Sequence, residues 1–332
     1  MTANITFPSL LQAFFTDRLL QQKQVSPHTV ASYRDTFCLL LRYAQQRLHK
    51  TPAKLPLNEL NAPMIIGFLD HLQQVRGTSA RSRNVRLAAI HSFFQYAALQ
   101  SPNYSALIER VLAIPTMRYT RNPIEFLTHT EIEALLAATD QSTWIGRRDR
   151  TLLLLAIQTG LRVSELIGLR WQDIVFGTGA HVHCEGKGRK TRCTPLRKDT
   201  VAALQAWQHE QQGRLETSVF PNARGQFLSR DGVAYLLAKY VAIAGQHCPS
   251  LQHKRVSPHV LRHSAAMELL QSGVDCAVIA LWLGHESMDT TQIYLHASLE
   301  LKERALEKTT PINEHPGRYR PDDELMAFLK GL

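Results

Sequence analysis

The most diagnostic stretch of the chain reads Ser-Pro-His-Val-Leu-Arg-His over residues 257–263. Ser257 is a typical N-cap and Pro258 suits a first helical turn, so the pattern predicts a helix that begins here. His259 and Arg262 are three residues apart and share one face of that helix. Both lie near its N-terminus, where the helix dipole favours an anion. A His-x-x-Arg pair alone is more often an ordinary surface pair, so the prediction of an anion site depends on its partners.

Four more side chains stand in short motifs of the same half of the chain. They are Arg162 in Thr-Gly-Leu-Arg-Val-Ser-Glu-Leu (159–166), Lys187 in Gly-Lys-Gly-Arg-Lys (186–190), His285 in Leu-Gly-His (283–285) and Tyr294 in Asp-Thr-Thr-Gln-Ile-Tyr (289–294). Taken singly, they read as a salt-bridge arginine (to Glu165, three residues on), a hairpin lysine, a histidine and a half-buried core tyrosine. Together, two arginines, a lysine and two histidines could neutralise a phosphodiester and move its protons while a tyrosine attacks phosphorus.

The spacing of His285 and Tyr294 sets a condition on the fold. They are nine residues apart, which on one straight helix turns them about half a turn away from each other. They converge only if the helix is interrupted between them. Gly284 and the segment 287–289 can supply that break.

The first ~110 residues predict four to five short helices with helical apolar spacing. N-caps are expected at Ser26, at Asn61, and at Ser79 or Ser82. In the second half, Thr128 and Glu131 form a capping box before a further helix. A buried helix follows from Arg147 and ends at Gly160, and the next one is expected to carry Arg162.

Residues 181–185 and 191–196 alternate like β-strands around a glycine-rich turn, which predicts a hairpin with Lys187 at its tip. Arg189 and Lys190 are rival candidates for the same role. Cys184 and Cys193 would lie nearly opposite each other across this hairpin. Neither these cysteines nor the nearby histidines have the paired spacing of a structural zinc site, so no metal site is expected.

Composition narrows the class of protein. The chain has 332 residues, 44% hydrophobic and 20% charged, which indicates a folded protein of about two domains. Its longest apolar run is too short to span a bilayer, and its start lacks the pattern of a secretory signal. Five scattered cysteines fit a reducing cytoplasm better than a disulfide framework. We therefore expect a cytoplasmic protein.

Charge is unevenly distributed. Residues 1–120 hold 13 lysines and arginines against five acidic residues, whereas residues 121–332 hold 25 against 23. The net charge of +10 favours a polyanionic partner, and the first third reads as an electrostatic clamp. Arg81, Arg83 and Arg86 cluster near the start of one predicted helix, and we expect them to contact DNA phosphates. A solvated basic face is the alternative for each arginine alone.

This set of residues, in this order, resembles the tyrosine recombinase (phage integrase) family over residues 125–305 and more loosely before them. The resemblance implies a mainly α fold with a small antiparallel β-sheet: a helical, SAM-like core-binding domain and a tyrosine recombinase catalytic domain. We expect the first domain at residues 1–113, a basic linker at 114–124 and the catalytic domain at 125–310. A tail at 311–332 would carry a short helix that docks on a neighbouring protomer.

The resemblance also implies roles. Arg162 and Arg262 would grip the scissile phosphate, Lys187 would protonate the departing 5′ oxygen, and Tyr294 would form a 3′-phosphotyrosine. His285 would support the phosphate, and His259 is the favoured acceptor of the tyrosine proton, although the sequence leaves the acceptor open.

No cofactor is expected, because the bond energy is conserved in the covalent intermediate. The partners would be double-stranded DNA and a tetramer of this chain on paired sites, with a related recombinase as a further candidate. The family resemblance is to Xer-like and mobile-element integrases. The alternatives are a DNA-binding protein without catalysis and a type IB topoisomerase. The target sequence and the natural substrate are not readable from the chain.

Overall fold

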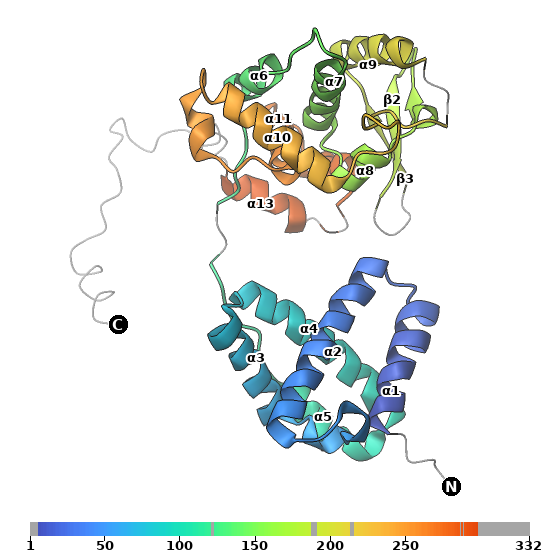
Figure 1. Cartoon of the computed structure of the whole chain (residues 1–332), viewed down its shortest axis with the longest axis vertical. Helices are drawn as coiled ribbons and strands as arrows, with labels where there is room; N and C mark the ends of the chain where they lie inside the picture. The colour runs from blue at the N-terminus through green and yellow to red at the C-terminus, as the bar shows by residue number, and fades with distance from the viewer. Residues whose placement is uncertain are drawn as a thin grey trace, which may run out of the picture. The chain divides into compact units, whose positions relative to one another are not determined.

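The computed structural model describes residues 6–120, 123–186, 191–212, 216–285, 287 and 289–297. The chain divides into two compact units, Met1–Arg121 and Asn122–Leu332. Both are mainly helical (Figure 1), which confirms the predicted fold class. The expected tail helix at 311–332 and the hairpin tip with Lys187 lie outside the described residues. No helix among the described residues is long and apolar enough to cross a membrane.

The first unit is a helical bundle. Its helices are α1 (Phe7–Ala13), which continues into a π-helical stretch (Phe14–Gln22), α2 (Pro27–Leu48), α3 (Ala62–Arg76), α4 (Ala80–Gln100) and α5 (Ser105–Leu112), with 3-10 turns at Pro52–Lys54, Leu57–Glu59 and Pro102–Tyr104. Its core contains edge-to-face aromatic pairs, in which Phe93 meets both Phe14 and Phe37. Such pairs stabilise a core beyond the burial of their area.

The predicted helix starts of this unit are confirmed. The side chains of Ser26, Asn61 and Ser79 each accept a hydrogen bond from a backbone N–H of the following turn. Of the two serines considered for the start of α4, it is Ser79 that caps the helix. These contacts are local in sequence, which is why the pattern alone predicts them.

The second unit combines helices with a small sheet. The helices are α6 (His129–Ala137), α7 (Trp144–Thr159), α8 (Val163–Gly168), α9 (Lys198–Gln211), α10 (Arg230–Ala244), α11 (Pro258–Gln271), α12 (Cys276–Leu283) and α13 (Asp289–Ala297), with 3-10 turns at Trp171–Asp173 and Pro249–His253. The capping box of Thr128 and Glu131 is present at the start of α6. As expected, α7 ends at Gly160, whose φ of 62° is the left-handed conformation that glycine adopts freely.

The sheet has three antiparallel strands in the order β1 (Ile174–Val175), β2 (His181–Glu185) and β3 (Thr191–Pro195). The sequence predicts the β2–β3 pair but not the two-residue β1, which is too short to show a period. The two cysteines lie nearly opposite each other, as expected, but are offset by one position: Cys184 faces Arg192, and Cys193 faces His183. Cys184 and Cys193 therefore point to opposite sides of the sheet.

Two hydrophobic clusters hold this unit together. The larger one lies around α7 and α10 and includes Trp171, Trp207 and Tyr240. The smaller one joins α11, α12 and α13 through Met267, Leu283 and Tyr294. The candidate nucleophile Tyr294 is thus part of a core, and its position depends on how these three helices pack.

Candidate active site

Arg162 lies directly after the left-handed turn at Gly160. The sequence predicts that Arg162 lies within a helix, and this prediction is wrong. Arg162 is the N-cap of α8, with an extended backbone (φ −65°, ψ 148°). Its Nη1 donates to Glu165 at 2.9 Å, which is the salt bridge that the spacing of three suggests. Its Nη2 donates to the carbonyl oxygen of Gly284 at 2.9 Å. The extended N-cap directs the guanidinium toward the end of α12.

Arg262 comes from α11, whose N-cap is Ser257 as predicted. Only 5% of Arg262 is exposed, and it donates to the carbonyl oxygens of Gly160 at 2.7 Å and Leu283 at 2.6 Å. Burial, with repulsion from Arg162, lowers the pKa of Arg262 to about 10. The guanidinium is still charged at neutral pH. Because it is buried, its electrostatic attraction for a bound anion is stronger than it would be in water.

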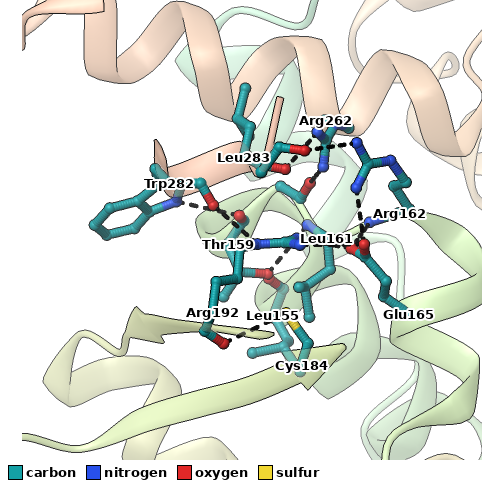
Figure 2. A network of polar contacts seen from close by, with 12 residues as sticks. Leu155, Thr159, Leu161, Arg162, Glu165, Cys184, Arg192, Arg262, Trp282 and Leu283 are labelled. Carbon is teal, nitrogen blue, oxygen red and sulfur yellow. Dashed lines mark hydrogen bonds and ion pairs between the residues drawn. The ribbon is translucent and has the colours of Figure 1, made fainter. Parts of the chain in front are cut away.

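A third arginine, Arg192, joins these two, although no motif in the sequence singles it out. Arg192 of β3 donates through both Nη atoms to the carboxylate of Glu165, at 3.2 Å and 2.7 Å, and through Nε to the carbonyl oxygen of Trp282 at 3.1 Å. Figure 2 shows Glu165 between Arg192 and Arg162. The alternation of β3 is a signal that could have found it, because Arg192 lies on the same face as the buried Thr194.

Glu165 is 5% exposed at its side chain. Burial alone would raise the pKa of this carboxyl group, but hydrogen bonds from Arg192 and from the backbone and side chain of Arg162 hold it below its usual value. Glu165 is therefore an anion that fixes both guanidinium groups.

Tyr294 is 1% exposed on α13. Its hydroxyl lies 3.0 Å from Nδ1 of His263, and the His285 ring stacks on its ring, with centroids 6.3 Å apart and planes 14° from parallel. The expected interruption is confirmed, because α12 ends at Leu283 and α13 begins at Asp289. Burial raises the pKa of Tyr294, and the nearby charge of Arg262 partly opposes this.

The two histidines at the tyrosine are neutral in the folded protein. Burial lowers the pKa of His263 to about 4, helped by His259 and Arg262. Burial and the charges of Arg262 and Arg162 lower the pKa of His285 to about 4. A neutral imidazole has one acceptor nitrogen, so either ring can accept a hydrogen bond. Nδ1 of His285 is hydrogen-bonded with the hydroxyl of Thr291 at 2.8 Å.

The structure thus brings together four of the six expected catalytic residues, namely Arg162, Arg262, His285 and Tyr294. His259 is exposed at the start of α11, one turn before the histidine that touches Tyr294. Lys187 lies outside the described residues. His263 was missed because nothing in its local sequence distinguishes it from a polar residue on a helix.

The three arginines expected to contact DNA differ in their surroundings. Arg81 is exposed at the start of α4. Arg83 is 6% exposed, and Arg86 donates to the carbonyl oxygen of Ser32 at 3.1 Å and the hydroxyl of Thr36 at 3.0 Å. Arg81 is therefore the most accessible of the three to a ligand, and Arg86 contributes to the packing of α4 on α2.

Two family models match the chain. Residues 125–300 match the phage integrase family, and residues 13–101 match the N-terminal SAM-like domain of phage integrases. The chain belongs to the phage integrase family of tyrosine recombinases. It is a tyrosine-type site-specific recombinase, an enzyme that breaks and rejoins DNA through a covalent tyrosine intermediate.

The relatives of this recombinase cover most or all of its length. It is 56% identical over 332 residues, all of both chains, to the Sinorhizobium fredii integrase/recombinase y4rC. It is 32% identical over 293 residues to the tyrosine recombinase XerD of Vibrio cholerae, covering 86% of this chain and 91% of that protein. The crystal structure of the XerH recombinase in a post-cleavage complex with its difH substrate has the same fold, with a TM-score of 0.69, 21% identity and coverage of 86% and 81%.

Proposed function

We propose that Tyr294 is the nucleophile of this recombinase and that Arg162 and Arg262 bind the scissile phosphate. The observation that carries the proposal is the meeting of these residues at the end of α12. Arg262 and Arg162 donate to the consecutive carbonyl oxygens of Leu283 and Gly284, and the next residue, His285, stacks on Tyr294. Residues that are far apart in sequence are thereby collected within one small volume.

The reaction balances without a cofactor or a metal. The hydroxyl oxygen of Tyr294 attacks phosphorus, the bond from phosphorus to the 5′ oxygen breaks, and a 3′-phosphotyrosine and a free 5′ hydroxyl result. Arg162 and Arg262 offset the charge that develops on the non-bridging oxygens. Lys187 supplies a proton to the departing 5′ oxygen. A 5′ hydroxyl from the partner strand then attacks the phosphotyrosine. A phosphodiester bond forms between the two strands, and Tyr294 is released.

The proton of Tyr294 has two candidate acceptors. A general base must lie within hydrogen-bond reach of the proton that it takes. His263 meets this condition in the free protein, at 3.0 Å. His259, the acceptor favoured from the sequence, is one helical turn away on the exposed face of α11, and we assign it to the DNA phosphate together with His285.

A change of conformation must precede cleavage. Since only 1% of Tyr294 is exposed, a phosphodiester reaches its hydroxyl only after α13 shifts. The bound phosphate then replaces the carbonyl oxygens that occupy Arg162 and Arg262 in the free protein. DNA binding thus supplies the anion for which the two arginines are already arranged.

The natural setting follows from the chemistry of strand exchange. Two duplexes are cut and joined at four strands, which requires four copies of the chain on paired sites. Of the three arginines expected to contact DNA, Arg81 would bind the DNA backbone, because Arg83 is buried and Arg86 is hydrogen-bonded to α2. We propose that a related recombinase can serve as a partner in the assembly and that the reaction takes place in the cytoplasm.

The test is a covalent adduct on a nicked duplex. Nicked duplexes tiled across the DNA that flanks the coding sequence are incubated with the enzyme in EDTA and run on a denaturing gel. We expect a protein–DNA adduct with the wild type, none with Tyr294→Phe, and retained binding by both in a native gel. If the protein binds the duplexes but forms an adduct on none of them, the result would instead support a DNA-binding protein without catalysis.

A further inference from the structure

Three consecutive backbone carbonyls at the end of α12 are each bound by a different arginine. Arg192 donates to Trp282, Arg262 to Leu283 and Arg162 to Gly284. We call these three oxygens the 282–284 carbonyl row. The last carbonyls of a helix lack partners within the helix and carry its negative dipole end. The row therefore presents partial negative charge to three guanidinium groups, which come from β3, α11 and the start of α8 (Figure 2).

A glycine makes this arrangement possible. Gly284 ends α12 in the left-handed conformation, with φ 64°, and its N–H and that of His285 close the helix onto Leu281 and Ala280. A Cβ atom at position 284 would lie 2.8 Å from Nη1 of Arg192. The Arg192 side chain thus packs directly against the residue that precedes His285. A shift of the Arg192 side chain would therefore also shift Gly284 and His285.

The second partner of Arg192 is Glu165, which it shares with Arg162. Oε1 of Glu165 accepts from both arginines, at 3.2 Å from Arg192 and 2.9 Å from Arg162. Arg192 also donates a hydrogen bond to Oε2 of Glu165 at 2.7 Å. One carboxylate thus serves two guanidinium groups. Without Arg192, the full charge of this buried carboxylate would act on Arg162 alone, and Arg162 would be drawn toward it and away from the phosphate.

The place of Arg192 in the chain adds a third connection. It lies on β3, opposite Cys184 of β2, five residues after Lys187. β3, which follows Lys187 in the chain, is thereby fixed to Glu165 and to α12. Arg192 in this way holds Glu165, which binds Arg162, and the end of α12, which directly precedes His285.

We propose that Arg192 is a positioning residue of the recombinase. It neutralises the Glu165 carboxylate and donates a hydrogen bond to the Trp282 carbonyl oxygen, so that Arg162 can bind the phosphate. This deepens the proposed function and depends on it. Losing Arg192 should slow cleavage by about 10²-fold through misplacement of Arg162, with DNA affinity within about threefold of the wild type.

A double variant separates this role from a merely structural one. Arg192→Ala leaves Glu165 as an unshared buried carboxylate, whereas Arg192→Ala combined with Glu165→Gln removes that charge. We expect the double variant to form adduct at least tenfold faster than Arg192→Ala, although Glu165→Gln alone slows the wild type. A loss of packing alone would make the double variant no faster. Arg197→Ala is the matched control, because this arginine lies just beyond β3 and forms exposed ion pairs with Asp199 and Glu268.

The measurement is the single-turnover rate of adduct formation on the nicked duplex that the wild type cleaves, with binding measured separately and folding checked by circular dichroism. If Arg192→Ala does not fold, Arg192→Lys replaces it; this variant keeps the charge but not the three-point contact and should cleave more than threefold more slowly than the wild type. Cleavage within threefold of wild type by a folded Arg192 variant, or no gain from Glu165→Gln, overturns the proposal. Absence of an adduct with the wild type would instead count against the proposed function.

Discussion

Nδ1 of His263 lies 3.0 Å from the hydroxyl oxygen of Tyr294, and the two rings meet edge to face with their centroids 5.6 Å apart. The contact joins α11, which carries the phosphate-binding Arg262, to α13, which carries the nucleophile. Because the tyrosine is almost fully buried, this hydrogen bond defines the resting position of its hydroxyl group. A bound phosphodiester would add negative charge beside His263 and raise its pKa, which makes the histidine a better proton acceptor when DNA is present.

The first prediction concerns which histidine takes the proton. Asparagine at position 263 can still accept a hydrogen bond but cannot take up a proton at neutral pH. We therefore expect His263→Asn and His263→Ala to slow adduct formation alike, by about 10²-fold. The measurement is the single-turnover rate, with binding as a control. A near-normal rate for His263→Asn, or a larger loss in His259→Asn, would assign the proton to another group.

The second prediction is a loss of stability in mild acid. The pKa of His263 and of His285 is about 4 in the folded protein, against 6.5 for a free histidine. Between these values the unfolded chain binds more protons, so the free energy of unfolding falls as the pH drops from about 6.5 to about 4. The expected loss from pH 7 to pH 5 is at most roughly 2 kcal/mol per histidine.

Urea unfolding of the full chain at the two pH values measures this loss. His263→Asn and His285→Asn should each reduce it, whereas His129→Gln should not, because the His129 side chain is 81% exposed. A midpoint that does not move between pH 7 and pH 5 would contradict the burial of these rings.

The third prediction compares two left-handed glycines of the same unit. At Gly160 a Cβ atom would lie 2.6 Å from Leu283 and 3.2 Å from Ala265, whereas at Gly273, with φ 83°, it would meet nothing within 4 Å. We expect Gly160→Ala to cost roughly 2–4 kcal/mol and Gly273→Ala about 1 kcal/mol. Only Gly160→Ala should also slow cleavage, because the Gly160 carbonyl holds Arg262. Equal losses of stability in both variants would contradict the close packing at Gly160.

The fourth prediction separates two arginines of α4. Arg81 is exposed, whereas Arg86 is hydrogen-bonded to α2. We expect Arg81→Ala to weaken binding to all duplexes alike and to reduce the slope of log K against log salt by about 1. Arg86→Ala should mainly lower the stability of the N-terminal unit, by roughly 1–3 kcal/mol. Titrations at several salt concentrations and thermal unfolding measure the two effects, and an unchanged salt slope for Arg81→Ala would exclude it as a phosphate contact.

What the sequence predicts well is local. The caps at Ser26, Asn61, Ser79 and Ser257 and the box at Thr128 depend on residues within one turn, so their pattern is sufficient to place the helix starts. The break after Leu283 is predicted for a similar reason, because a glycine followed by polar residues cannot easily extend a helix.

What the sequence misses depends on contacts between distant segments. His263 is separated by 31 residues from Tyr294 and Arg192 by 27 from Glu165, and neither pair leaves a periodic trace. Arg83 shows the opposite error: its charge suggests an exposed phosphate contact, but it is 6% exposed. A single sequence records which side chains are charged but not which of them the tertiary structure encloses.

The most direct test of the account identifies the residue that carries the DNA. The adduct formed on a nicked duplex is digested with nuclease and trypsin, and the modified peptide is sequenced by mass spectrometry. The account predicts a nucleotide joined through its 3′ phosphate to Tyr294, with Tyr240, which is also buried in the C-terminal unit, unmodified. Attachment to any other residue, or through a 5′ phosphate, would contradict the proposed nucleophile and the roles assigned around it.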